Sequence, residues 1–253
     1  MSESAFETYI KSVNIRELLE GLGVPNIDAL VREIRHFTLK EAEKRDSIVL
    51  GYFGETGINR IVDSIAECMV SRPGLPTNAK VLDVGAGSGF FTLRVMEKLR
   101  DKMPSLAFYA VDLTPAMLQV LARESSEVTP FLGVAENIGG SVEQARKWLV
   151  VPKKFDAVYS TLMLHHSLAP EKVFFSVRRA LKTSGKAIII DMCKHPFTEF
   201  RSEMGDVHLG FETTSIEVMA KKYFKTVMVK KMPGIRCESS GRAAEVFIAY
   251  MLA

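Results

Sequence analysis

The architecture follows from the stretch Val81-Leu82-Asp83-Val84-Gly85-Ala86-Gly87-Ser88-Gly89, which connects a short apolar run to an amphipathic segment beginning at Phe90. Three glycines at alternate positions let the backbone bend sharply and approach a ligand closely, because no Cβ intervenes. The first N–H groups of a helix that follows such a turn have no partners within the helix. The sequence therefore predicts a strand, a glycine turn and a helix N-terminus that together bind a ligand.

The spacing of these glycines distinguishes between ligands. Dinucleotide-binding turns follow the pattern GxGxxG, and here Phe90 stands where the third glycine of that pattern belongs. A diphosphate needs N–H donors and no nearby carboxylate, so Asp83 disfavours a nicotinamide dinucleotide. S-adenosylmethionine carries a sulfonium and an ammonium group instead, and an acid beside it is favourable.

A second acid follows the next apolar run, in Tyr109-Ala110-Val111-Asp112. An acid at the end of the second strand can accept hydrogen bonds from both ribose hydroxyls of a nucleoside ligand. Asp112 has an alternative role, because Asp112-Leu113-Thr114-Pro115 also resembles a helix cap. Both the methyl donor and NAD contain ribose, so Asp112 alone does not separate them.

Strands and helices alternate from about residue 79, which predicts a mostly parallel sheet of the Rossmann-like α/β class. The predicted strands cover residues 80–84, 106–111, 129–134, 155–160 and 187–192, and the predicted helices cover residues 90–99, 115–123, 141–148 and 170–181. A helix over 215–223 then precedes strands 226–231 and 245–251. Their connection, 232–244, has a Pro-Gly and no helical pattern, so we expect an antiparallel C-terminal hairpin.

The first 78 residues differ from the rest of the chain because their pattern is helical. We expect a helix capped by Asn14 and ended by Gly23, and further helices over 28–37, over 39–49 and after Thr56. Residues 72–78 serve as a linker. The chain therefore divides into an N-terminal helical cap or lid, 1–78, and a ligand-binding domain, 79–253.

Composition places the chain among globular proteins, with 253 residues, 47% hydrophobic and 25% charged. The net charge of +3 does not by itself indicate nucleic-acid binding. The three cysteines form no CxxC pair, which predicts reduced thiols and no metal site. The absence of a long apolar run and of a signal-like N-terminus predicts a cytoplasmic protein that does not bind membranes. An oligomer is possible, but nothing in the sequence indicates one.

Four segments resemble motifs of the class I S-adenosylmethionine-dependent methyltransferases, most closely those of ubiquinone and menaquinone biosynthesis. They are VLDVGAGSG (81–89), AVDLTPAML (110–118), FDAVYSTLMLHH (155–166) and LKTSGKAIIID (181–191). The resemblance implies a seven-stranded sheet that ends in a β-hairpin. It also implies S-adenosyl-L-methionine as the methyl donor and S-adenosyl-L-homocysteine as a product.

The same resemblance implies which residues bind the donor. The glycine turn lines its amino-acid and ribose end, Asp83 helps to hold the methionine portion, and Asp112 binds the ribose. Val134 departs from the family, which usually has an acid there, so a backbone carbonyl or Glu136 is expected to hold the adenine amino group. The implied donor-binding residues are Asp83, Gly85, Ala86, Gly87, Gly89, Asp112, Leu113, Ala135, Glu136 and Thr161.

The acceptor side is less clearly marked. Methyl transfer needs a base only when the nucleophile must lose a proton, and the candidate bases are His165, His166 and His208. The alternative is that these histidines cap a helix or line the cleft wall. Ser160-Thr161-Leu162-Met163 lacks the Asn/Asp-Pro-Pro-aromatic motif of enzymes that methylate base amines. We therefore expect a small-molecule acceptor rather than nucleic acid, covered by the N-terminal helices with Tyr52 and Phe53.

Two other functions remain open at this point. A nicotinamide-dependent oxidoreductase is disfavoured by Phe90 and Asp83. A non-catalytic module that binds S-adenosylmethionine as a sensor or scaffold is compatible with every motif described.

Overall fold

The computed structural model describes residues 5–36 and 38–253 of the chain. A seven-stranded sheet with the order β3-β2-β1-β4-β5-β7-β6 forms its centre. The strands are β1 (Lys80–Val84), β2 (Ala107–Asp112), β3 (Val128–Leu132), β4 (Phe155–Thr161), β5 (Leu181–Met192), β6 (Thr226–Ser239) and β7 (Arg242–Leu252). The first five are parallel, and β7 is antiparallel to both β5 and β6. The predicted Rossmann-like sheet with an antiparallel C-terminal hairpin is confirmed.

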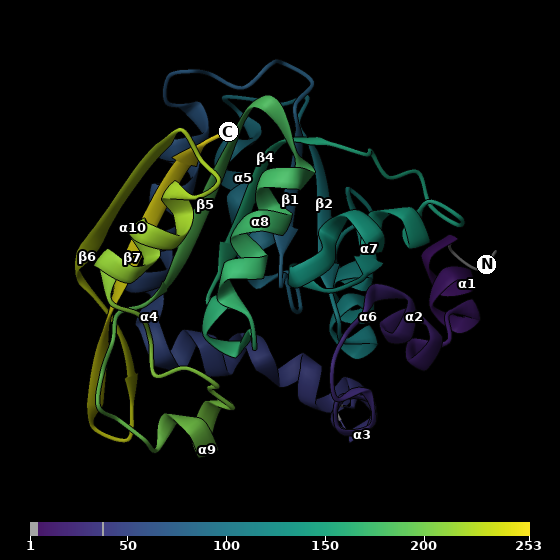
Figure 1. Ribbon diagram of the computed structural model, residues 1–253, viewed down its shortest axis with the longest axis horizontal. Coiled ribbons are helices and arrows are strands. Elements are labelled where there is room, and N and C mark those ends of the chain that lie inside the picture. The colour runs from purple at the N-terminus through teal and green to yellow at the C-terminus, as the bar shows by residue number, and fades with distance from the viewer. Residues whose placement is uncertain (1–4, 37) are drawn as a thin grey trace.

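Helices cover both faces of the sheet, as Figure 1 shows for α8 and α10 in front of it and α5 behind it. Because both faces are covered, β4 is buried along its whole length. The helices that follow the glycine turn are α5 (Phe90–Arg100), α6 (Pro115–Glu124), α7 (Ile138–Ala145), α8 (Pro170–Ala180), α9 (Phe200–Met204) and α10 (Thr213–Lys221), with short 3-10 turns η1 (Ala135–Asn137) and η2 (Leu164–His166).

The N-terminal part is helical, as expected, and consists of α1 (Ala5–Ser12), α2 (Ile15–Leu22), α3 (Ile27–His36) and α4 (Leu39–Val70). Asn14 caps α2 by accepting the N–H groups of Arg16 and Glu17, and Gly23 ends it with φ 71°. Two helices were predicted where α4 stands. The structure joins them across a kink at Gly54 (φ 59°, ψ 164°). The predicted helix over 28–37 ends at a residue outside the described ones.

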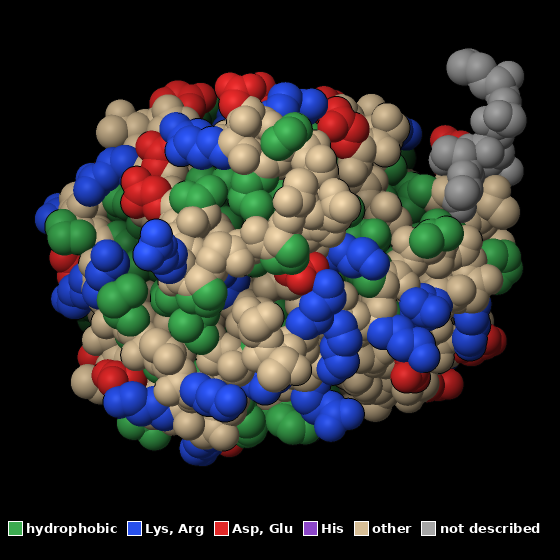
Figure 2. All heavy atoms as spheres, turned by 90° about the horizontal axis from the view of Figure 1, so that it is seen from above, with side chains coloured by type: hydrophobic (Ala, Val, Ile, Leu, Met, Phe, Trp, Pro, Cys, Tyr) green, Lys and Arg blue, Asp and Glu red, His purple; other side chains and the backbone are tan. Residues whose placement is uncertain are grey.

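Parallel strands in this sheet all end at one edge, and α3, the first half of α4 and α9 lie along that edge (Figure 1). Figure 2 shows the opposite end of the molecule, where Lys and Arg side chains stand in separate groups among apolar and acidic ones. No described histidine is visible on that face. Ligand sites in open α/β sheets lie at the carboxyl ends of the strands, which is the edge that α4 covers.

The predicted connection between the last two strands is wrong. Strand pairing resumes after a bulge, with Arg236 opposite Glu245 and Ser239 opposite Arg242. The turn of the hairpin is Ser240–Gly241, whose φ angles are 50° and 74°. Such positive angles are typical of tight two-residue hairpin turns. Ile235 and Cys237 are buried between exposed neighbours, and this alternation is the strand signal that the Pro-Gly at 233–234 obscured.

Candidate active site

In the glycine turn after β1, two glycines are closely packed against other side chains and one has free space beside it. Gly85, Gly87 and Gly89 have φ angles of 72°, 56° and 84°. A Cβ at Gly85 would lie 2.2 Å from Met163, and a Cβ at Gly89 would lie 2.3 Å from Leu121. At Gly87 the nearest atom to such a Cβ is 4.0 Å away. Gly85 and Gly89 therefore allow close packing, whereas Gly87 keeps the turn open on the side where a ligand can approach.

Asp112 connects the end of β2 to this turn. Its carboxylate accepts the N–H of Gly87 at 2.9 Å and the N–H of Thr114 at 2.8 Å. Burial raises the pKa of Asp112, and the backbone hydrogen bonds counteract part of that rise. The bond to Thr114 is the capping contact considered above, and the bond to Gly87 shows that the acid also shapes the glycine turn. Each carboxylate oxygen keeps a further lone pair, so ribose binding stays a prediction.

Asp83 lies beneath the turn, with 2% of its surface exposed. The Thr92 hydroxyl on α5 donates to its carboxylate at 2.7 Å. Burial raises the pKa of Asp83 to about 7, and the bond from Thr92 lowers it somewhat. In this position Asp83 joins β1 to α5, and its predicted contact with the methionine portion stays untested.

The residues predicted around the adenine gather at the ends of β2 and β3. Leu113, Ala135 and Glu136 are all half-buried. Glu136 accepts a hydrogen bond from the Ser167 hydroxyl at 2.6 Å. Thr161, at the end of β4, is buried, and its hydroxyl has no hydrogen-bond partner among the described residues.

The helical cap contacts the glycine turn directly. The Ser88 hydroxyl donates a short hydrogen bond to the carboxylate of Asp46, on the first half of α4. Tyr52, one helical turn and a half further along, is half-buried, and burial raises its pKa. Among the charges that influence Tyr52 are those of Arg45 and Asp206. The first half of α4 thus contacts the glycine turn and lies near enough to Asp206 for the two to interact electrostatically.

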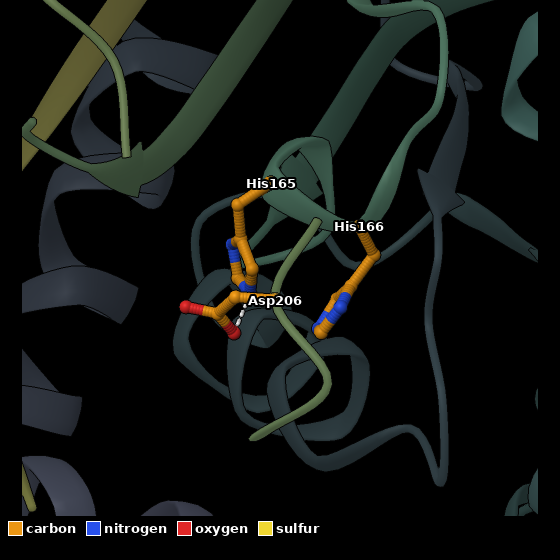
Figure 3. A group of neighbouring side chains, drawn as sticks. All are labelled: His165, His166 and Asp206. Atoms are coloured by element: carbon orange, nitrogen blue, oxygen red, sulfur yellow. Dashed lines mark ion pairs between the residues drawn. The ribbon is translucent and has the colours of Figure 1, made fainter. Parts of the chain in front are cut away.

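His165 is the centre of this second group. Its Nδ1 lies 2.7 Å from the Asp191 carboxylate at the end of β5. Its Nε2 faces Asp206, which follows α9, at 3.6 Å (Figure 3). The exposed fractions of His165, Asp191 and Asp206 are 4%, 0% and 3%. Burial opposes protonation of His165, but the charge of Asp191, the hydrogen bond to Asp191 and the charge of Asp206 together outweigh burial, so the pKa of His165 is raised.

The other two candidate bases are adjacent. The rings of His165 and His166 have centroids 4.0 Å apart, and Nδ1 of His166 lies 3.2 Å from the carbonyl of Gly205. Burial and the neighbouring His165 lower the pKa of His166 to about 3. Nε2 of His208 lies 2.9 Å from the Ser167 carbonyl, and its backbone N–H donates to the carbonyl of His165. The structure therefore brings all three predicted bases together.

This geometry limits what each histidine can do as a base. His165 lies between two carboxylates, and its raised pKa means that it keeps its proton to a higher pH than an ordinary histidine, which disfavours it as the base. His166, with a pKa of about 3, is a weak proton acceptor. Base catalysis by these residues stays a prediction.

Sequence reasoning missed Asp191, Asp206 and Arg45. The charge of Arg45 lowers the pKa values of His165, His166 and Asp206. Asp191 had a usable signal, because an acid at the carboxyl end of the fifth strand lies at the ligand-binding edge. Asp206 stands two residues before His208, yet no local pattern indicates that it faces His165.

Comparisons with known proteins show the family of the chain. Residues 75–231, more than half of the chain, match the family described as "Methyltransferase domain". The chain is 28% identical over 144 residues to the biotin biosynthesis bifunctional protein BioHC of Teredinibacter turnerae, covering 56% of this chain and 24% of that one. It is 31% identical over 113 residues to the mitochondrial ubiquinone biosynthesis O-methyltransferase of Schizosaccharomyces pombe, covering 44% of this chain and 36% of that one. The chain thus spans a quarter to about a third of these two relatives.

Solved structures share the fold. Phosphoethanolamine N-methyltransferase 2 of Haemonchus contortus, in complex with S-adenosyl-L-methionine, superposes with a TM-score of 0.61 at 17% identity, covering 95% of this chain and 60% of that one. A SAM-dependent methyltransferase from Aquifex aeolicus gives a TM-score of 0.53 at 16% identity, covering 85% of this chain and 98% of that one. Within residues 5–36 and 38–253, no helix has the length and apolar character required to span a membrane.

Proposed function

Because the chain belongs to the methyltransferase domain family, we propose that it transfers the methyl group of S-adenosylmethionine to a small-molecule acceptor. The observation that carries this proposal is the glycine turn, open at Gly87 and hydrogen-bonded there to Asp112. A turn of this kind lets a ribose approach the backbone closely. A diphosphate at the same place would be repelled by the nearby carboxylates, and S-adenosylmethionine has none. We also propose, from the unpaired cysteines, that the protein works in the cytoplasm.

The proposed donor site follows the carboxyl edge of the sheet. The ribose lies against Asp112, the methionine portion lies near the glycine turn above Asp83, and the adenine lies between Leu113 and Ala135. Glu136 is half-buried, and one of its oxygens already accepts a hydrogen bond from Ser167. Its second oxygen can accept a hydrogen bond from the adenine amino group. The remaining proposed contacts are Gly85, Ala86, Gly87, Gly89 and Thr161.

The acceptor is proposed to bind between the first half of α4 and the histidines after β4. A lone pair of the acceptor forms the new bond to the methyl carbon, and the electrons of the breaking carbon–sulfur bond neutralise the sulfonium. Holding the two molecules in line supplies much of the rate enhancement. Enclosure by α4 excludes water from this reaction and selects the acceptor. The names of the relatives include both an O- and an N-methyltransferase, so either atom type fits the proposal.

Calorimetric titration tests the donor site. We expect S-adenosylmethionine to bind more tightly than NAD, and Asp112→Asn to weaken that binding by roughly 10- to 100-fold through loss of charge-assisted hydrogen bonds. Asp101→Asn, at an exposed acid after α5, is the matched control and should bind the donor normally. Tighter binding of NAD would refute the proposal. Incubation with labelled donor and a metabolite extract tests catalysis, and tight donor binding with no labelled product would indicate a non-catalytic module.

A further inference from the structure

Asp206 is a buried acid whose side chain makes no hydrogen bond to any residue in 5–36 or 38–253. Only 3% of its surface is exposed, and neither carboxylate oxygen has a hydrogen-bond partner among the described residues. The nearest cationic group is Nε2 of His165, at 3.6 Å. Burying a carboxylate without hydrogen bonds is costly, so the position calls for a cation. Figure 3 shows this carboxylate turned toward the imidazole ring of His165.

His165 is oriented as metal-binding histidines are. Such residues usually donate one ring N–H to a carboxylate, which fixes the tautomer and leaves the other nitrogen for the metal. The Asp191 carboxylate holds Nδ1 of His165 at 2.7 Å and also accepts the N–H of Met192. Nε2 of His165 therefore points away from Asp191 and toward Asp206.

His166 completes the group. Its Nδ1 can donate to the carbonyl of Gly205 at 3.2 Å, which leaves Nε2 with a free lone pair. One ligand atom from each of His165, His166 and Asp206 lies within 4.8 Å of the other two. In a tetrahedral site with bonds of about 2.1 Å, ligand atoms are about 3.4 Å apart. The side chains therefore need to close by at most about 1.4 Å.

We propose that His165, His166 and Asp206 bind one divalent transition-metal ion, with zinc as the best match. Two imidazoles and one carboxylate are a typical zinc set, whereas magnesium and calcium prefer oxygen ligands alone. The charge of Arg45 opposes a cation at this position, and the charge of Asp191 favours one. Three protein ligands leave one coordination position open, as in catalytic zinc sites.

The consequence for the reaction rests on the proposed function. The open position would bind an oxygen or sulfur atom of the acceptor and lower its pKa, so that the acceptor loses its proton to solvent water as it binds, without a protein base. The competing arrangement is a protonated His165 that bridges Asp191 and Asp206 and binds no metal. The metal must displace that proton from Nε2, so binding releases a proton.

The test uses the full-length protein, stripped with a chelator and titrated with Zn²⁺ by calorimetry and with Co²⁺ by visible absorption. We expect one ion per chain, a tetrahedral cobalt spectrum, and a proton released on binding. Asp206→Asn should weaken binding by at least about 100-fold, and Asp191→Asn, which leaves all three ligands in place, by roughly 10- to 100-fold. His195→Gln removes another buried histidine outside the group and should bind normally.

Three results would overturn the metal site. They are no saturable 1:1 binding below about 1 mM, equal affinity in Asp206→Asn, and loss of binding in Cys237→Ser, which would assign the ion to thiols. Affinity for S-adenosylmethionine, measured on the same stripped samples, separates this proposal from the proposed function. Intact donor binding with no metal binding refutes only the metal site, and absent donor binding counts against the methyltransferase proposal.

Discussion

Lys186 provides the sharpest test of how the helical cap is joined to the sheet. This lysine of β5 has no exposed surface, and its Nζ donates to the carbonyls of Cys68, Met69 and Ser71 at 2.9, 3.1 and 3.0 Å. These carbonyls are at the end of α4, where a helix lacks internal partners. A positive charge there is also favourable to the helix dipole. Burial lowers the pKa of Lys186, so the carbonyls must compensate for removing the ammonium from water.

Lys186→Met keeps the volume of the side chain and removes the three hydrogen bonds. Each bond to a charged donor contributes about 1.5–3 kcal/mol. The carbonyls of Cys68 and Ser71 can regain water because these residues are partly exposed, whereas Met69 is fully buried. The variant also avoids the desolvation of an ammonium, which costs several kcal/mol. We therefore expect a net loss of about 2–4 kcal/mol in the free energy of unfolding.

Urea denaturation followed by far-UV circular dichroism measures this loss. The matched control is Lys194→Met, at an exposed lysine just after β5, which should change the stability by less than about 0.5 kcal/mol. A loss below about 1 kcal/mol in Lys186→Met, with an unchanged slope of the unfolding free energy against urea concentration, would refute the reasoning. It would show that the hydrogen bonds from the ammonium to the three carbonyls add little to stability.

Three further predictions concern the glycine turn, the acid beneath it and the contact between α1 and β3. Gly89→Ala should lower the unfolding free energy by roughly 2–4 kcal/mol, since its Cβ would overlap Leu121 at 2.3 Å and φ is 84°. Asp83, whose pKa rises to about 7 on folding from an unfolded value near 4, makes the protein lose stability as the pH rises from about 4 to 7, on the order of 4 kcal/mol in total. Asp83→Asn should remove that loss when unfolding is measured across this range. Tyr9→Phe should cost about 1–3 kcal/mol, because the N–H of Leu132 loses the phenol oxygen that accepts it at 3.0 Å.

Each of these has a control and a contrary result. Gly74→Ala, at a position where no atom of the described residues lies within 4 Å of the new Cβ, should be nearly neutral, and equal losses at both glycines would contradict the packing argument. For Asp83 the sign is decisive: the unfolded chain ionises first, so stability must fall with rising pH, and an unchanged slope in Asp83→Asn would refute the assignment. A Tyr9→Phe variant as stable as the parent would show that water replaces the phenol.

The first four strands, the glycine turn and the helices beside it were predictable because each is written in a short run of neighbouring residues. The predicted strand over 80–84 coincides with β1, and the predicted strand over 155–160 ends one residue before β4. The end of α2 at Gly23 was also predictable from the local sequence. The connection within the C-terminal hairpin was the exception, because Pro-Gly at 233–234 lies in a bulge rather than outside the strand, and only pairing with β7 shows this.

The amino-acid sequence alone determined the class of the sheet, the position of the glycine turn and the acids that flank it, since apolar periodicity and glycine spacing act over a few residues. Tertiary structure decided the rest. Lys186 meets the end of α4 across 115 to 118 positions of the chain, and His165 meets Asp191 across 26. Asp206 reaches the same imidazole from the loop after α9. The strength of such contacts depends on burial and on distances that no local pattern encodes, because they exist only after separate elements have packed together.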